Sequence, residues 1–165
     1  METRQAIETR ASVRAFKPEP VERQVLEQLV DAGRRAPSAR AVEPWEFVVV
    51  TNRECLLKLS VLAKNGSFLK QAPAAVIVFS QDTPYYLEDG CAATENILLA
   101  AADAGLGACW IAGDKKPYAA QVAQLVKAPS SLKLISILAL GWPAEPGQQK
   151  KARALAEVLH WETFD

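Results

Sequence analysis

The sequence has no excess of charge of either sign. Nineteen Lys and Arg side chains balance nineteen Asp and Glu side chains, which gives a formal net charge of zero at pH 7. Without a global positive field, the chain does not attract nucleic acid or an anionic membrane surface. We therefore expect neither as a partner, and any anion that the protein binds must be held by a local cluster of side chains.

Cysteine and histidine are scarce. Cys55, Cys91 and Cys109 are odd in number, are widely spaced and form no CxxC pair, so the sequence predicts neither a disulfide framework nor a metal site. Three unpaired thiols favour small, buried, reduced side chains and a cytoplasmic location. We interpret His160, the single histidine, as a structural residue beside Trp161 rather than as a catalytic base.

Long hydrophobic runs are also missing. The first residues, METRQAIETRASVR, are charged throughout and lack the apolar region of a signal peptide. The longest apolar stretch, residues 97–112, is interrupted by Asp103, Gly105 and Gly107. It is too short and too broken to span a bilayer, so we expect no membrane partner.

The composition is that of one folded domain. Half of the 165 residues are hydrophobic and 23% are charged, whereas Gly and Pro number only 8 and 10. This excludes a disordered or fibrous chain. A second core would leave each half marginally stable, so we expect a single domain over residues 1–165.

Two kinds of periodicity predict the secondary structure. Apolar residues at helical spacing, or alanine-rich stretches, predict helices over residues 2–8, 21–35, 53–64, 85–104 and 118–126. Asn65-Gly66 and Gly105 are expected to end two of these helices in a left-handed conformation. Continuous apolar runs predict strands over residues 47–51, 74–80, 108–112 and 134–142. Such strands are buried on both faces, which indicates an α/β or α+β layered domain.

The predicted helix over residues 85–104 has small and apolar residues around its whole circumference. A helix of this kind must be buried, either inside the core of one chain or between two copies, and we favour the dimer. Its two carboxylates, Glu95 and Asp103, lie more than two turns apart. We therefore expect a capping or interface role for them rather than a catalytic pair.

A possible anion site lies near the N-terminus. Arg10, Ser12 and Arg14 alternate in RASVRAF, so in an extended segment they point the same way. Two guanidinium groups and a hydroxyl can converge on one phosphate or carboxylate. Taken alone, the same pattern also fits a solvated surface.

Five motifs occur in order along nearly the whole chain: RxSVRxF, APSA followed by PWxF, AxxENILLAAxxxGLGxCWI, LxLGWPAEP, and an Arg shortly before EVLHW. Together they resemble the FMN-dependent nitroreductase family. The resemblance implies a nitroreductase-like α+β sandwich with a mixed sheet flanked by helices. It also implies an intertwined homodimer with FMN at the interface between the two chains.

The resemblance also implies where the FMN phosphate binds. It places this phosphate against Arg10, Ser12 and Arg14. Arg153, from the other end of the chain, completes the set, and Lys151 is a weaker candidate. Bidentate arginines suit a phosphate that carries about 1.5 to 2 negative charges.

Other residues are implied to surround the flavin ring. Pro37 and Ser38 match a loop that reaches the ring from the partner subunit. Asn65 matches a position whose amide faces the polar edge of the flavin. The stretch from Trp110 to Gly113 matches the strand end and loop near the ring.

The chain departs from the family pattern at two positions. The usual loop PSxxNxQPW has Ala41 in place of Asn and Glu43 in place of Gln. An ionised Glu43 near the ring would disfavour the anionic reduced flavin. Alternatively, Glu43 faces solvent or pairs with Arg40.

The implied activity is an FMN-dependent oxidoreduction. NADH or NADPH reduces the bound flavin, which then reduces a small-molecule acceptor such as a nitroaromatic or a quinone, by ping-pong kinetics. Because the chemistry belongs to the flavin, no catalytic side chain is expected. No GxGxxG motif is present to distinguish NADH from NADPH. The alternative is a flavin-binding or sequestering protein with little turnover, motivated by Ala41 and Glu43.

Overall fold

A computed structural model describes residues 1–147 and 151–164. Its centre is a sheet of four strands in the order β1-β2-β4-β3. The strands are bounded as follows: β1 Trp45–Val50, β2 Ala74–Gln81, β3 Gly107–Ala112 and β4 Leu132–Gly141. All four strands were therefore predicted at nearly the right places.

The strand pairing differs from the mixed sheet that the resemblance implied. Each of the three neighbouring pairs is antiparallel. A parallel pairing occurs at the edge of the sheet, where Ser12 forms a bridge to Ala108. The parallel component of the sheet within one chain is therefore this isolated bridge.

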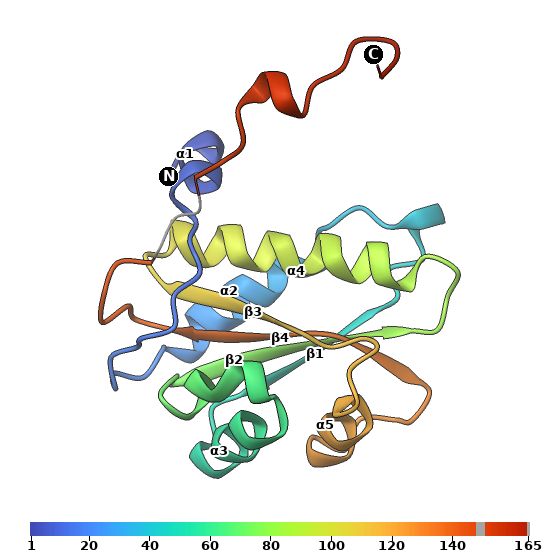
Figure 1. The fold of residues 1–165 in the computed structure, drawn as a ribbon. Helices are drawn as coiled ribbons and strands as arrows, with labels where there is room; N and C mark the ends of the chain where they lie inside the picture. Colours follow the sequence, from blue (N-terminus) through green and yellow to red (C-terminus); the bar gives the residue numbers. More distant parts are fainter. Residues whose placement is uncertain (148–150, 165) are drawn as a thin grey trace.

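Helices cover both faces of the sheet (Figure 1). One face packs against α2 (Arg23–Arg34) and α4 (Tyr86–Asp103), the other against α3 (Arg53–Leu62), α5 (Ala119–Leu125) and the 3-10 segment η2 (Lys64–Lys70). Alternate residues of β2 face the two layers: Ile77 points to the α3 side and Val76 to the α4 side. This confirms the expected layered domain, in which central strands are apolar on both faces.

Helix α4 packs closely against its neighbours because small residues face them. A Cβ atom at Gly90 would lie 2.6 Å from the side chain of Ile135, and one at Gly33 would lie 2.8 Å from Ile97. Gly105, with a φ of 74°, follows the helix in the left-handed conformation, as predicted. The opposite side of α4, which includes Leu99, is only half-buried within one chain.

The end of α3 differs from the prediction. The helix stops at Leu62 rather than at residue 64, and the chain continues into η2. Gly66 has a φ of −115°, so the expected left-handed ending at Asn65-Gly66 is wrong. A glycine serves here because a Cβ atom would lie 2.9 Å from the Ile111 side chain.

The two ends of the chain lie on the α4 side of the domain. Helix α1 (Thr3–Thr9) lies beyond α4, and residues 151–164, with the short turn η3 (Leu155–Glu157), extend away from the sheet as an arm (Figure 1). Large apolar side chains of the arm are exposed: Leu155, Val158, Leu159, Trp161 and Phe164. Within one chain, this apolar surface has nothing to cover it.

Among the described residues, no helix is both long enough and apolar enough to cross a membrane. Within the same part of the chain, no group of three or more His, Cys, Asp or Glu side chains is arranged to hold a metal ion.

Candidate functional site

The segment after α1 lies along the start of β3. The amide of Val13 donates a hydrogen bond of 2.9 Å to the carbonyl oxygen of Ala108, beside the bridge formed by Ser12. Gly107 makes this approach possible, because a Cβ atom there would lie 2.7 Å from Val13. The alternating Ser12 and Arg14 are therefore held at one end of an edge strand.

The outer edge of β3 is open beyond this point. The carbonyl group of Ala108 points away from β4, and in an antiparallel ladder every second residue points the same way. The backbone groups of Trp110 and Ala112 therefore also face outward. From Ala108 to Gly113 the edge runs for about 17 Å, at roughly 3.4 Å per residue.

Arg14 lies between β3 and η2. Its guanidinium carbon is 5.9 Å from the centre of the Phe68 ring, within the range of a cation–π contact. On the other side it approaches Cys109. Burial raises the pKa of the Cys109 thiol, while the charge of Arg14 and a hydrogen bond with Ser12 lower it by smaller amounts.

Arg10 is held by α4. Its Nε atom lies 3.5 Å from a carboxylate oxygen of Glu95, and the α-amino group of Met1 lies 2.6 Å from Asp103. Within one chain, both carboxylates tie the N-terminal segment to α4. An interface role for them stays a prediction.

Asn65 lies exposed at the start of η2. Gly66, next to it, packs against Ile111 of β3, so Asn65 is close to the far part of the open edge. Gly113, at the end of this edge, is buried against β4. The structure thus brings three predicted elements together: the Ser12–Arg14 segment, Asn65 and the end of β3.

Pro37 and Ser38 lie elsewhere. They precede β1, at the opposite edge of the sheet from β3, about 14 Å away across three strand spacings. The loop is anchored at both ends, because the amide of Ala39 donates to Asp89 and that of Glu43 donates to the Ser38 hydroxyl, each over 2.9 Å. Pro37 and Ser38 therefore cannot join the Ser12–Arg14 segment of their own chain.

The same loop is strained. Arg40, Ala41 and Glu43 have φ values of 56°, 53° and 50°, which residues with a side chain rarely adopt. Such strain persists only where the surroundings impose it, and it is common at functional sites. Glu43 is exposed, and in the described part of the chain it forms no ion pair with Arg40.

The family model that matches the chain is that of the nitroreductase family, over residues 7–86 and 56–142. The chain belongs to this family. A relative from Methanothermobacter thermautotrophicus, provisionally named NADH dehydrogenase/NAD(P)H nitroreductase, is 34% identical over 154 residues, which cover 89% of this chain and 81% of the relative.

Solved structures of family members agree with the fold. An FMN-dependent nitroreductase from Clostridium difficile superimposes with a TM-score of 0.87 at 30% identity, covering 96% of this chain and 98% of the other. A provisionally named nitroreductase from Desulfovibrio desulfuricans, solved in complex with FMN, gives a TM-score of 0.84 at 28% identity over 100% and 99% of the two chains. The nitroreductase-like fold is therefore confirmed.

Two predicted phosphate ligands of this nitroreductase-family chain lie on the arm. Lys151 and Arg153 are both exposed. The Nη2 atom of Arg153 donates to the backbone oxygen of Glu157 over 2.7 Å. Neither residue contacts Arg10 or Ser12 within one chain, so their role stays a prediction.

The sequence reasoning missed three partners of the candidate site. Phe68 supports Arg14, Glu95 pairs with Arg10, and the buried carboxylate of Asp89 anchors the loop before β1. The position of Asp89 could have revealed its role. It lies in the first turn of an otherwise apolar helix, and a buried carboxylate there needs a hydrogen-bond donor from another segment. Nothing in the spacing pointed to Phe68.

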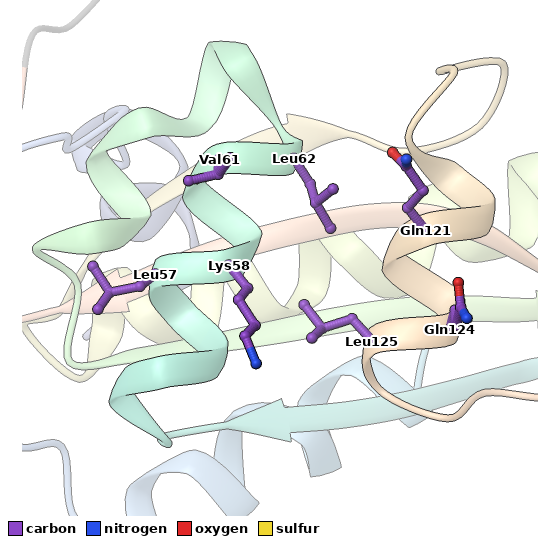
Figure 2. A pocket seen from close by; sticks show the side chains of 7 residues that line it. All are labelled: Leu57, Lys58, Val61, Leu62, Gln121, Gln124 and Leu125. Carbon is purple, nitrogen blue, oxygen red and sulfur yellow. The ribbon is translucent and has the colours of Figure 1, made fainter.

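Another hollow lies on the α3 side of the domain. A groove of about 500 Å³ opens between α3 and α5, as Figure 2 shows. Its walls are mostly apolar, and none of the predicted site residues contributes to it. The lining residues are Leu57, Lys58, Val61, Leu62, Gln121, Gln124 and Leu125.

Proposed function

We propose that this nitroreductase-family chain is an FMN-dependent oxidoreductase that takes electrons from NADH or NADPH. It passes them to a nitroaromatic, a quinone or a similar small-molecule acceptor. The observation that carries the proposal is the open edge of β3, which has Ser12 and Arg14 at one end and Asn65 near the other. Donor and acceptor use one face in turn, which is ping-pong kinetics.

The residues at the start of β3 suit the phosphate of FMN. Ser12 and Arg14 line one hollow at this end of the strand. We assign Arg10, which is paired with Glu95 of α4, to the same phosphate as a second guanidinium group. The Nε atom of Arg10 lies 3.5 Å from a carboxylate oxygen of Glu95, and the side chain is partly exposed, so the guanidinium group can also meet an anion. A phosphate with about 1.5 to 2 negative charges is well matched by such charge-assisted contacts.

The rest of the edge suits a flavin ring. The ring has donors and acceptors along one side, and the outward backbone groups of Trp110, the backbone N–H of Ala112 and the amide of Asn65 offer a complementary set. The backbone oxygen of Ala112 is already engaged by the Tyr118 hydroxyl. When bound, FMN supplies the hydride chemistry. The side chains bind and orient it, so the proposal assigns no catalytic side chain.

The site is complete only in a homodimer. Pro37 and Ser38 are too far from the Ser12–Arg14 segment of their own chain, so we assign them to the flavin held by the other copy. Lys151 and Arg153, on an arm with exposed apolar side chains, are assigned to a phosphate in the assembled dimer. The half-buried side of α4 supports the same arrangement, since a second copy would cover it.

A cytoplasmic location fits this function. Cys55, Cys91 and Cys109 are all free thiols in the structure. A reducing compartment keeps unpaired cysteines in this state.

One observation favours a second candidate, a flavin-binding protein with little turnover. Glu43 replaces an amide of the family pattern in a strained loop, and its carboxylate has no cation beside it in the described ion pairs. In the dimer, this loop would lie beside the flavin of the other copy. An ionised carboxylate there would oppose negative charge on the reduced ring.

The visible spectrum tests both candidates. We expect the purified protein to be yellow, or to become so with FMN, and its flavin absorbance to bleach rapidly in anaerobic stopped-flow mixing with NADH or NADPH. A flavin that stays oxidised under an excess of both donors would favour the binding protein. A protein that remains colourless with FMN would refute both.

A further inference from the structure

The turn after β3, residues 113–118, carries two adjacent lysines. Lys115 and Lys116 are exposed, and within residues 1–147 and 151–164 no ion pair joins either of them to a carboxylate. Lys115 has a φ of 59°, in the left-handed region. A residue with a Cβ atom keeps this strained conformation only where its surroundings impose it.

Two tyrosines impose it. The hydroxyl group of Tyr118 donates to the backbone oxygen of Ala112, just before the turn. The hydroxyl group of Tyr86, at the start of α4, donates to Asp114 over 3.1 Å. This hydrogen bond raises the pKa of Tyr86. Asp114 is thereby held by α4 rather than by the lysines.

The turn lies at the rim of the proposed flavin site. Tyr118 packs in the same apolar cluster as Phe68 and Ile111, and Phe68 in turn lies under the guanidinium group of Arg14. The turn directly follows Ala112, where the proposed flavin edge of β3 ends, so a substrate on the open face of the flavin would approach the turn that carries the two lysines.

The surroundings of the turn carry charges of both signs. Asp82 and Glu88 act on Tyr86, and Asp82 is paired with Lys133 over 3.2 Å. Asp114 accepts a hydrogen bond from the Tyr86 hydroxyl. No ion pair among the described residues joins these carboxylates to Lys115 or Lys116, so the two ammonium groups can meet an anion. Ammonium groups on flexible stems act as point charges toward carboxylates and phosphates alike.

We propose that Lys115 and Lys116 bind the anionic group of the substrate on the flavin face, so that this chain prefers anionic over uncharged substrates. The inference rests on the proposed function. The anion has two possible sources, a carboxylate on the acceptor or the phosphates of the nicotinamide donor.

The test compares matched charged and uncharged substrates on the FMN-loaded protein. The acceptor arm uses 4-nitrobenzoate and 4-nitrobenzamide, and the donor arm uses NADH and 1-benzyl-1,4-dihydronicotinamide. Each is measured with the double variant Lys115→Gln/Lys116→Gln and with the control Lys127→Gln. Lys127 is also exposed and left-handed, with a φ of 56°, but it lies after α5.

We expect the ratio of kcat/KM for the anionic over the uncharged substrate to fall about threefold per lysine and about tenfold in the double variant, for unit charges roughly 6 Å apart in water. The fall should shrink at high salt. A change in the acceptor arm alone identifies the acceptor carboxylate as the ligand, and a change in the donor arm alone identifies the nicotinamide phosphates.

Two results would overturn the inference. One is an unchanged ratio in both arms, and the other is an equal fall in the Lys127→Gln control. A wild-type flavin that neither donor reduces is a different result, because it refutes the proposed function itself.

Discussion

Arg10→Ala tests the assignment of the phosphate end of the site. FMN and riboflavin differ only by the phosphate, so a residue that binds this group must affect one ligand and not the other. The carboxylate of Glu95 lies 3.5 Å from the Nε atom of Arg10 and holds this side chain beside α4.

The magnitude follows from the exposure and the partner of the guanidinium group. A hydrogen bond to a charged group contributes about 1.5 to 3 kcal/mol. The Arg10 side chain keeps 35% of its exposure and already interacts with Glu95, so the lower part of this range applies. We therefore expect the FMN dissociation constant to rise about tenfold to thirtyfold, since about 1.4 kcal/mol corresponds to a factor of ten.

Quenching of flavin fluorescence during titration of the apoprotein measures both constants. Arg4→Ala is the matched control, because Arg4 lies on α1 and is paired with Glu8, away from β3. The control should leave FMN affinity unchanged. If Arg10→Ala weakened riboflavin and FMN equally, or weakened neither, Arg10 would not be a phosphate ligand.

Three further predictions concern the support of the site. The buried hydroxyl groups of Thr94 and Ser136 lie 2.9 Å apart, so Thr94→Val should lower the free energy of unfolding in urea by about 1 to 3 kcal/mol, because Ser136 loses its partner; an unchanged value would contradict this hydrogen bond. Gly113→Val should lower the free energy of unfolding by about 1 to 3 kcal/mol and therefore the Tm, since a Cβ atom would lie 2.8 Å from the backbone of Ile135. An unchanged Tm would show that the backbone of the turn shifts to make room for the side chain. Burial raises the pKa of the Cys109 thiol, so iodoacetamide at pH 8 should modify this thiol more slowly in the native than in the unfolded protein. Peptide mass spectrometry measures both rates of modification. Equal rates would show that the thiol is accessible in the native protein.

The layered fold was predictable because its signals are local. The apolar run of β2 is buried on both faces along nearly its whole length, and this requires helices on both sides of the sheet. The β-branched run in β1 also formed a strand, but at the edge of the sheet, where it is only partly buried and Val49 is exposed. Gly105 follows the end of α4 in the left-handed conformation, as predicted. A glycine adopts this conformation more easily than any residue with a side chain.

The conformation at Asn65-Gly66 was not predictable from the same rule. An Asn-Gly pair is compatible with a left-handed ending, but tertiary packing decided otherwise. Gly66 is needed for its close approach to Ile111 of β3, a contact between residues 45 positions apart. Local propensity carries no information about such a contact.

The candidate site was predictable only in part. The alternation of Arg10, Ser12 and Arg14 suggested an anion cluster, whereas the pairing with β3, the Phe68 contact and the Glu95 contact depend on tertiary structure. The strand order, which places Pro37 and Ser38 at the opposite edge from Ser12, also cannot be read from spacing. The proposal that the site needs a second copy rests on this order.

Native mass spectrometry of the FMN-saturated protein tests the central claim, that two copies together enclose the cofactor. We expect two chains of 17.9 kDa with two FMN molecules, and loss of both the flavin and the dimer when residues 151–165 are removed. A single chain that retains one FMN, or a dimer that binds none, would contradict the account.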